Sequence, residues 1–312
     1  MNTVIVTGAN AGLGFETCRQ LAGEAEVHKV ILTCRSEAKG KDAVAQLVGL
    51  TKKPSTFFDV VVMDTTDIVS CKIAAEKVLN EYTVNGVVLN AGGNISGNDS
   101  KGNPLMHLAN VIGHVVFTEE LLDSGKIDQL TVVYSGSEAA RGVSSLSMKP
   151  AKFDEPYKED VYNHLSGKSK REFNGDSAYK YTKAIAALYI ASLARKNPKH
   201  HIVTCSPGMT AGTNIMDNYV SSGVFKFFML NVAVPLLGLF GMAHSVDSGA
   251  SRYVDALFKR GNADVKSGTF LASKEGGLSG PVEDQSTFIP IFADTKLQDD
   301  AYDAVHDLIR TL

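Results

Sequence analysis

Short β-branched runs alternate with longer amphipathic stretches along this 312-residue chain, and this alternation constrains its fold more than any other feature. Runs rich in Val, Ile and Thr predict buried strands, whereas apolar residues spaced three and four apart predict helices. An ordered series of such pairs is typical of βα units that build a parallel sheet. We therefore expect an α/β fold, a single-domain Rossmann fold with a doubly wound, seven-stranded parallel sheet and helices on both faces. The expected strands are Thr3–Thr7, Lys29–Cys34, Phe58–Met63, Val84–Leu89, Gln129–Ser135, His201–Cys205 and Gly268–Ala272, with helices near residues 13–24, 37–49, 67–82, 107–124, 177–196 and 245–259.

Two stretches interrupt the alternation, namely residues 138–176 and residues 208–244. Both follow expected strands, and ligands bind doubly wound sheets in the crevice outside the carboxyl ends of the strands. No repeat, low-complexity tract or Pro/Gly/Ser-rich linker divides the chain. We therefore expect one domain over residues 1–312, with an insertion at 138–176 and a substrate lid at 208–244.

Charge and cysteine content narrow the functional classes. A formal charge of -3 without a long Lys/Arg-rich run offers no basic field for a phosphate backbone, so we expect no nucleic-acid partner. The four cysteines, Cys18, Cys34, Cys71 and Cys205, are scattered and form no CxxC pair. This spacing argues against a zinc site or a disulfide framework and fits a reducing compartment. We expect no metal.

Two features bear on location. Only Met1–Thr3 precede the first apolar run, which leaves no room for a signal or transit peptide, so we expect a cytoplasmic protein, or an organellar one if the sequence is trimmed. Val224–Met242 is nearly all apolar and about as long as a membrane span. Lys226, Asn231 and Pro235 interrupt it, and no flanking charge asymmetry orients it. We expect an interfacial or lid helix pair there, with peripheral membrane contact at 224–242, a core position or a spanning helix as alternatives.

The turn after the first expected strand carries the motif Thr7-Gly8-Ala9-Asn10-Ala11-Gly12-Leu13-Gly14. Glycines allow a sharp turn and a close approach to a pyrophosphate, which binds free N–H groups at the positive end of the following helix. The flanking strand and helix supply the context that a dinucleotide site requires. The alternative is a glycine-rich turn without a ligand. We expect cofactor contacts at Gly8, Asn10, Ala11, Gly12, Leu13 and Gly14.

The spacing TGxxxGxG resembles that of short-chain dehydrogenases/reductases, and motifs similar to that family's others follow in order between residues 3 and 272. Asn90-Ala91-Gly92-Gly93 resembles the NNAG turn, and Asn110 the helix asparagine. Ser135-Gly136-Ser137 resembles the catalytic-serine motif, and Tyr179–Lys183 the YxxxK signature. The resemblance implies further cofactor contacts at Asp64, Asn90, Ala91, Gly92, Tyr179, Lys183, Pro207, Gly208, Thr210 and Thr213.

Tyr179 and Lys183 carry the expected chemistry. Residues four apart lie on one face of a helix, so the Lys183 ammonium can approach the Tyr179 phenol and favour its phenolate form. Such a phenol donates a proton to a carbonyl or takes one from an alcohol. The resemblance implies that Lys183 reaches the nicotinamide ribose, that Ser137 orients the substrate oxygen, and that Asn110 helps to hold a water that resupplies protons. Ser135 competes with Ser137 for the serine role, and an isolated pair would indicate only a partly buried Tyr beside a snorkelling Lys.

The end of the second expected strand bears on cofactor choice. An NAD enzyme is expected to place an acidic residue there on the ribose 2′-hydroxyl, but the sequence has Arg35 and Ser36. The guanidinium of Arg35 suits a 2′-phosphate, with Ser36 or Asn10 assisting. We therefore expect NADP(H) rather than NAD(H). The alternative is a solvated arginine at a helix start.

A long insertion suggests a subgroup. Tyr179 follows Ser137 by 42 residues, and the approach Phe173–Lys180 resembles that of light-dependent protochlorophyllide reductases. Retinol dehydrogenase-like enzymes and monomeric carbonyl reductases are similar in having long insertions here. Met209 stands where the protochlorophyllide enzymes carry Cys, which argues against pigment photoreduction. Gly212 stands where the family usually has Thr, with Thr210 and Thr213 on either side.

We expect an NADP-dependent oxidoreductase that interconverts a carbonyl and an alcohol on a small apolar substrate, with Tyr179 as general acid and base. The apolar residues of the expected lid motivate the substrate class, because ligand pockets are mainly apolar with few polar anchors. The alternatives are a C=C reductase and a non-catalytic NADP-binding redox sensor on the same fold. We expect a monomer if the long insertion covers the helix face used for dimerisation, and a homodimer if it does not.

Overall fold

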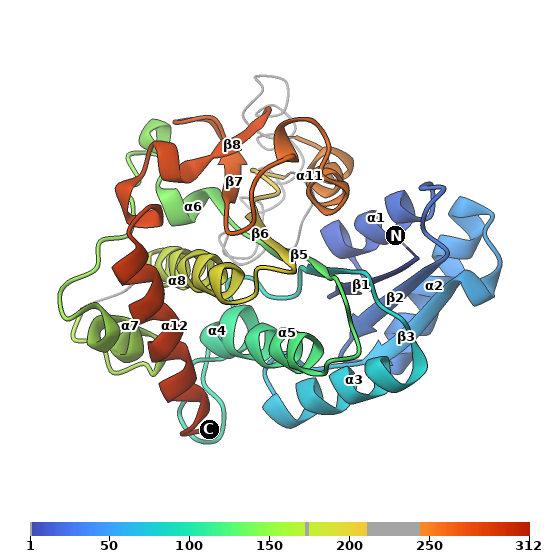
Figure 1. Ribbon diagram of the computed structural model, residues 1–312, viewed down its shortest axis with the longest axis horizontal. Coiled ribbons are helices and arrows are strands. Elements are labelled where there is room, and N and C mark those ends of the chain that lie inside the picture. Colours follow the sequence, from blue (N-terminus) through green and yellow to red (C-terminus); the bar gives the residue numbers. More distant parts are fainter. Residues whose placement is uncertain (1, 172–174, 211–243) are drawn as a thin grey trace, which may run out of the picture.

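A computed structural model of the chain describes residues 2–171, 175–210 and 244–312. In this part of the chain the strands form one sheet in the order β3-β2-β1-β4-β5-β6-β7-β8 (Figure 1). The order reverses between β1 and β4, which is the topology of a doubly wound Rossmann sheet. The strands are β1 (Thr3–Thr7), β2 (Lys29–Cys34), β3 (Phe58–Val62), β4 (Gly86–Leu89), β5 (Thr131–Ser135), β6 (His201–Cys205), β7 (Phe270–Ser273) and β8 (Val282–Asp284).

Helices cover both faces of the sheet. One core lies under α1, α2 and α11, and the other lies under α3, α5 and α8. Successive side chains of β1 enter opposite cores, with Val4 and Val6 in the first and Ile5 in the second, as the pleat of a strand buried on both faces requires. The helices are α1 (Gly12–Leu21), α2 (Glu37–Thr51), α3 (Ile68–Glu81), α4 (Leu105–His107), α5 (Gly113–Asp123), α6 (Glu138–Arg141), α7 (Tyr157–Leu165), α8 (Gly175–Lys196), α11 (Val246–Phe258) and α12 (Thr295–Ile309).

The expected fold class is confirmed, with one difference in the sheet. Seven parallel strands were expected, whereas an eighth strand, β8, pairs antiparallel with β7 through Leu271 and Asp284. Strand β8 has three residues, Val-Glu-Asp, and lacks the β-branched run by which the others are detected. The single domain over residues 1–312 stays a prediction.

The expected helix at 107–124 is composite. Residues Leu108–Ile112 form a π-helix, labelled η2, between α4 and α5. The insertion at 138–176 contains α6, the 3₁₀ turn Ser144–Leu146 and α7. Helices α7 and α12 pack together, and α12 also packs along α8 (Figure 1).

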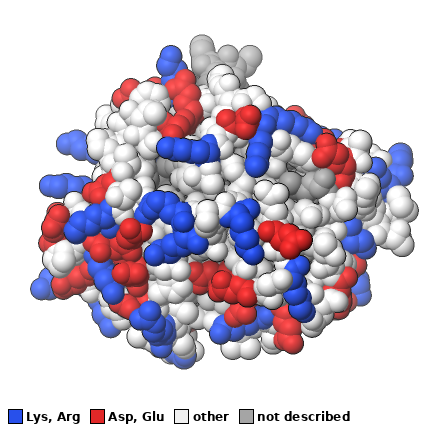
Figure 2. All heavy atoms as spheres, viewed as in Figure 1, with Lys and Arg blue, Asp and Glu red and all other residues white. Residues whose placement is uncertain are grey.

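The expected lid lies largely outside the described residues, as do Thr213 and the apolar stretch 224–242. Within the described part of the chain, no helix combines the length and the apolar character needed to cross a bilayer. The face in Figure 2 carries basic and acidic side chains interspersed, so its described residues present mixed charge.

Candidate active site

The residues predicted to form the site follow strands that are neighbours in the sheet. The glycine motif follows β1, Asn90–Gly93 follow β4, Ser137 follows β5 and Pro207-Gly208 follow β6. The order β1-β4-β5-β6 is continuous, and all three pairings are parallel. The carboxyl ends of these strands therefore share one edge, where ligands bind in doubly wound sheets.

The turn between β1 and α1 leaves no room for side chains at two of its glycines. A Cβ on Gly8, whose φ is +64°, would lie 2.9 Å from the Ala91 Cα, and one on Gly14 would lie 2.5 Å from the Gly8 oxygen. Gly12 has φ +58° and open space around it. Helix α1 then begins after Ala11 without a side-chain cap, so its first N–H groups are available to an anion. This cradle fits a dinucleotide pyrophosphate.

Hydrogen bonds join this turn to the turn after β4. The Asn90 Nδ2 donates to the Thr7 oxygen at 2.9 Å, and the Ala91 N–H donates to the Thr7 Oγ1 at 2.9 Å. The His114 Nε2 lies 3.1 Å from the same hydroxyl. Burial lowers the pKa of His114 to about 3, so the ring is neutral at physiological pH. His114 was not predicted, although it stands four residues after Asn110 on the same stretch of helix.

Asn110 is fully buried in the π-helix, and its amide holds the turn after β4. Its Oδ1 accepts from the Gly93 N–H at 3.0 Å, and its Nδ2 donates to the Gly93 and Met106 oxygens, each at 2.8 Å. A Cβ on Gly92 would lie 2.4 Å from the Asn110 Oδ1. The Asn110 carbonyl accepts from the Tyr134 hydroxyl at 2.6 Å. Asn110 thus positions the Gly92-Gly93 turn, and its role in proton supply stays a prediction.

Helix α8 presents Tyr179 and Lys183 to the end of β5. Their side chains are buried, and the Lys183 Nζ donates to the Ser135 oxygen at 2.8 Å. The same Nζ lies 5.8 Å from the centre of the Tyr179 ring and 5.0 Å from that of Tyr134. Burial lowers the pKa of Lys183 to about 7, because the interior disfavours its charged form. The structure therefore brings Tyr179 and Lys183 together, as their spacing predicts.

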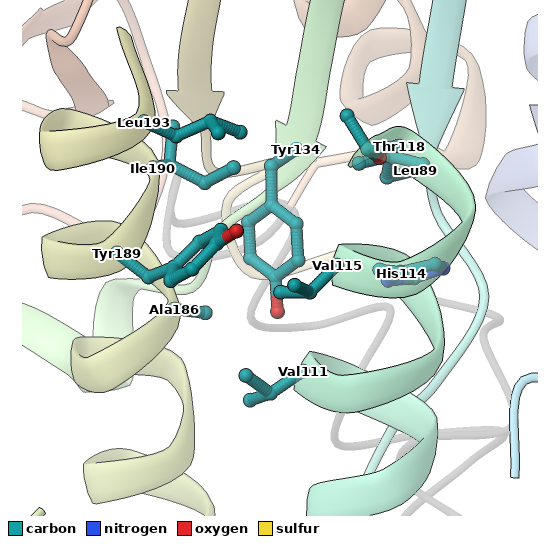
Figure 3. A pocket seen from close by; sticks show the side chains of 10 residues that line it. All are labelled: Leu89, Val111, His114, Val115, Thr118, Tyr134, Ala186, Tyr189, Ile190 and Leu193. Carbon is teal, nitrogen blue, oxygen red and sulfur yellow. The ribbon is translucent and has the colours of Figure 1, made fainter. Parts of the chain in front are cut away.

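Tyr134, a second unpredicted residue, supports this arrangement. Figure 3 shows its ring reaching from β5 into the space between α5 and α8, where Val115 and Ala186 line a small cavity. Its hydroxyl donates to the Asn110 oxygen in the π-helix η2, while its ring faces Lys183. The apolar run Thr131–Tyr134 contains no sequence signal for this role.

The two candidate serines have different surroundings. The Ser135 Oγ lies 2.7 Å from the Tyr253 hydroxyl of α11 and is buried in that contact. Ser137 is partly exposed, and its Oγ accepts from the Ala139 N–H at 3.2 Å, which caps α6. This difference favours Ser137 as the serine that can meet a substrate.

The residues predicted for the adenosine end lie after β2 and β3. Arg35 is exposed at the end of β2, and the Ala9 N–H donates to the Thr33 oxygen at 3.1 Å, which ties this end to the glycine turn. Ser36 caps α2 by accepting from the Lys39 N–H at 3.4 Å. Asp64 accepts from the Thr66 N–H at 2.9 Å and the Thr66 hydroxyl at 2.8 Å. Ser36 and Asp64 thus also have local structural roles.

The turn after β6 lies at the other end of the row of strands. Gly208 has φ +76°, and the Thr210 Oγ1 lies 3.2 Å from its carbonyl oxygen and 3.4 Å from that of Pro207. Thr210 therefore lies beside Pro207-Gly208, and its contact with a cofactor stays a prediction. Thr213 lies outside the described residues.

Comparison with known proteins agrees with this geometry. The family model for short chain dehydrogenases matches residues 2–141. A short chain dehydrogenase of Hypocrea virens is 30% identical over 268 residues, which cover 82% of this chain and 72% of that protein. A short-chain dehydrogenase/reductase of Armillaria gallica is 31% identical over 207 residues, which span 65% of this chain and 62% of the relative's length. The chain belongs to the short-chain dehydrogenase/reductase family, a family of oxidoreductase enzymes.

Solved structures share the fold. Salutaridine reductase from Papaver somniferum has a TM-score of 0.59 at 22% identity, over 86% of this chain and 99% of that one. An NADPH-bound carbonyl reductase from chicken fatty liver has a TM-score of 0.55 at 20% identity, over 86% of this chain and 95% of that one.

Proposed function

We propose that the chain is an NADP-dependent oxidoreductase that interconverts a carbonyl and an alcohol on an apolar substrate. One observation carries the proposal. Tyr179 and Lys183 lie together at the carboxyl end of β5, where the Lys183 Nζ is 2.8 Å from the Ser135 oxygen. Ser137 follows two residues later on the same chain segment. A phenol, an amine and a hydroxyl at one strand end suit proton exchange with a substrate oxygen.

The residues present fit a nicotinamide dinucleotide. The glycine turn and the uncapped start of α1 would hold the pyrophosphate, and Arg35 would pair with a 2′-phosphate. Asp64 would lie at the adenine and Lys183 at the nicotinamide ribose. The chicken carbonyl reductase, which shares the fold and has NADPH bound, supports the choice of NADP(H). When bound, the nicotinamide supplies or accepts the hydride.

The acid and base work falls to side chains of this chain. In reduction, Tyr179 donates its hydroxyl proton to the carbonyl oxygen, and in oxidation it takes the proton of the alcohol. Ser137 holds the same substrate oxygen by a hydrogen bond. When Lys183 is protonated, its positive charge stabilises the Tyr179 phenolate. The hydrogen bond from the Lys183 Nζ to the Ser135 oxygen fixes the position of the lysine.

The composition of residues 208–244 supports an apolar substrate, because runs such as Val234-Pro235-Leu236-Leu237 provide few polar partners. The proposal is tested by following NADPH absorbance with a panel of hydrophobic ketones, aldehydes and enones, with NADH in parallel. We expect turnover of carbonyls with a preference for NADPH. Turnover of enones alone would replace the proposal by C=C reduction. NADPH binding without turnover would favour a sensor, and no binding would overturn the cofactor assignment.

We also propose that the chain is a monomer. Helix α12 packs along α8, where the Ser192 Oγ donates to the Asp299 Oδ1 at 2.6 Å and the Tyr189 and Tyr302 rings stack at 5.2 Å. These contacts cover part of α8 with the chain's own residues. Light scattering would overturn this proposal if it gave twice the mass of the chain.

A further inference from the structure

Three charged side chains lie buried together beside the serine segment. Glu138, Arg141 and Arg252 are 5%, 3% and 7% exposed. The Arg141 Nη2 lies 2.8 Å from the Glu138 Oε2, and the Arg252 Nη1 lies 3.3 Å from the Glu138 Oε1. We call these three residues the buried triad. Ionised side chains are almost never fully buried unless they are paired, and a buried pair is weak evidence for a gain in stability.

Glu138 fixes the segment that carries Ser137. It follows Ser137 directly and begins α6. Its Oε1 accepts from the Ser273 N–H at 3.0 Å and from the Ser273 hydroxyl at 2.8 Å, and Ser273 is the last residue of β7. One carboxylate therefore anchors the serine segment to a strand two places along the sheet from β5.

Arg252 fixes the turn that carries Pro207 and Gly208. From α11, its Nη1 donates to the Ser206 oxygen at 3.0 Å, one residue before that turn. Its Nη2 donates to the Ser273 hydroxyl at 2.8 Å and to the Gly280 oxygen at 2.6 Å. A Cβ on Gly208 would lie 2.7 Å from the Arg252 Nη1, so the turn lies directly against the guanidinium.

The triad therefore ties together two segments that carry site residues from different strands. Arg141 extends the same connection, because its Nη1 donates to the Gly142 oxygen at 2.9 Å and its Nη2 donates to the Gly277 oxygen. A planar guanidinium offers donors in a fixed fork, so it sets directions as well as distances. Apolar residues of similar volume would pack this space without setting either.

We propose that Glu138 and Arg252 are positioning residues, which hold the Ser137 segment and the Pro207-Gly208 turn at a fixed spacing. The substrate-orienting hydroxyl and the cofactor contacts after β6 then stay in register during turnover. This inference rests on the proposed function, since it assigns those two segments to substrate and cofactor.

The test compares Glu138→Gln, Arg252→Lys, Arg252→Met and the double variant Glu138→Gln/Arg252→Met with the wild type. Asp299→Asn is the matched control, because Asp299 is about half exposed on α12 and pairs with Arg195 and Ser192 of α8, away from the triad. NADPH affinity is measured by fluorescence titration, kcat with a carbonyl from the panel, and folding by the midpoint of thermal unfolding. Displacement of a reacting group by about 1 Å lowers the rate on the order of 100-fold. We expect a fall in kcat of that size and about a tenfold rise in the NADPH Kd, whereas the control keeps both values.

The double variant separates positioning from stability. It leaves Arg141 buried without its carboxylate, whereas Arg252→Met keeps the Glu138–Arg141 pair. We therefore expect the unfolding midpoint of Arg252→Met to exceed that of the double variant, while kcat is low in both. Arg252→Lys keeps the charge and lacks the fork, so its kcat also stays low. The inference is overturned if kcat rises together with the midpoint from the double variant to Arg252→Met, or if the variants match the control. A wild type that binds no NADPH overturns the proposed function and this inference together, whereas an active wild type with unaffected variants overturns the inference alone.

Discussion

The two sides of the candidate site differ in which atoms form them, main-chain atoms on the β1 side and side-chain atoms on the β5 side. On the β1 side the main chain forms the site, since Gly8 and Gly14 allow neighbouring backbone to approach closely and α1 begins without a side-chain cap. On the β5 side buried side chains form the site: Lys183 is hydrogen-bonded to the Ser135 oxygen, and Glu138 is hydrogen-bonded to Ser273.

The starts of other helices sharpen this contrast. Side chains cap α2, α3, α11 and α12, namely those of Ser36, Asp67, Ser245 and Asp294. Such caps satisfy N–H groups that would otherwise lack a partner. Helix α1 has no such side-chain cap, and neither has α7, which begins after Pro156. A site formed by the main chain is therefore damaged by adding atoms, whereas a site formed by side chains is damaged by removing them.

Removing the Tyr179 hydroxyl should have the largest effect. We expect Tyr179→Phe to lower kcat by about 10²- to 10⁴-fold, which is the usual contribution of general acid–base catalysis. The NADPH Kd should change little, because the main-chain cradle is untouched. Tyr181→Phe is the control, since the Tyr181 hydroxyl donates to the Lys152 oxygen at 2.8 Å, in the insertion. Equal losses in the two variants would contradict the assignment of the proton to Tyr179.

The buried amine of Lys183 should give a pH-dependent stability. Burial lowers its pKa to about 7, whereas an unfolded lysine has a pKa of about 10.4. Between these pH values the unfolded chain binds a proton that the folded chain has released, so a rise in pH favours the folded state. The free energy of unfolding of the wild type, minus that of Lys183→Met, should rise by on the order of 3 kcal/mol from pH 7 to pH 10. Urea unfolding at several pH values measures this difference, and a flat or falling difference would show that Lys183 stays charged.

Adding one methyl group should damage the main-chain side. A Cβ on Gly14 would lie 2.5 Å from the Gly8 oxygen and 2.6 Å from the Asn90 Nδ2. We expect Gly14→Ala to lower the free energy of unfolding by about 2 kcal/mol, as overpacking does, and to weaken NADPH binding. Gly49→Ala is the control, because nothing lies within 4 Å of its Cβ position in α2, and it should stabilise the protein by about 0.5 kcal/mol. Urea unfolding and fluorescence titration measure both variants, and a Gly14→Ala protein with wild-type affinity would rule out the cradle.

Arg35→Met should have the smallest effect, a weaker preference for NADPH over NADH. Loss of hydrogen bonds to a charged 2′-phosphate is worth about 1.5 kcal/mol, or about tenfold in affinity for NADPH. The affinity for NADH should stay the same. Lys39→Met, at an exposed position of α2, is the control. If both variants keep the wild-type ratio of NADPH to NADH affinity, Arg35 does not read the phosphate.

The sequence predicts the main-chain side well, because glycine spacing directly records the φ values and close approaches that the turn requires. It also predicts the pairing of Tyr179 with Lys183, since helical spacing fixes which residues share a face. It does not predict Glu138 and Arg252, which are 114 residues apart and meet only through the packing of α11 on the sheet. Strand β8 is missed for a related reason, because three residues with two acidic side chains have no apolar period. Thr213 and the stretch 224–242 stay predictions.

The π-helix at Asn110 changes the directions in which the side chains of α5 point, relative to those of α4. A π-turn holds one more residue than an α-turn, and each residue of an α-helix advances it by about 100°. Every side chain of α5 is therefore rotated by about that angle from where a continuous helix starting at α4 would point it. The Met106 carbonyl, in α4, accepts a hydrogen bond from the Asn110 Nδ2 of the π-helix at 2.8 Å. Deleting one residue of Leu108–Ile112 would put α4 and α5 back in phase, and the apolar side of one of them would then face away from its core.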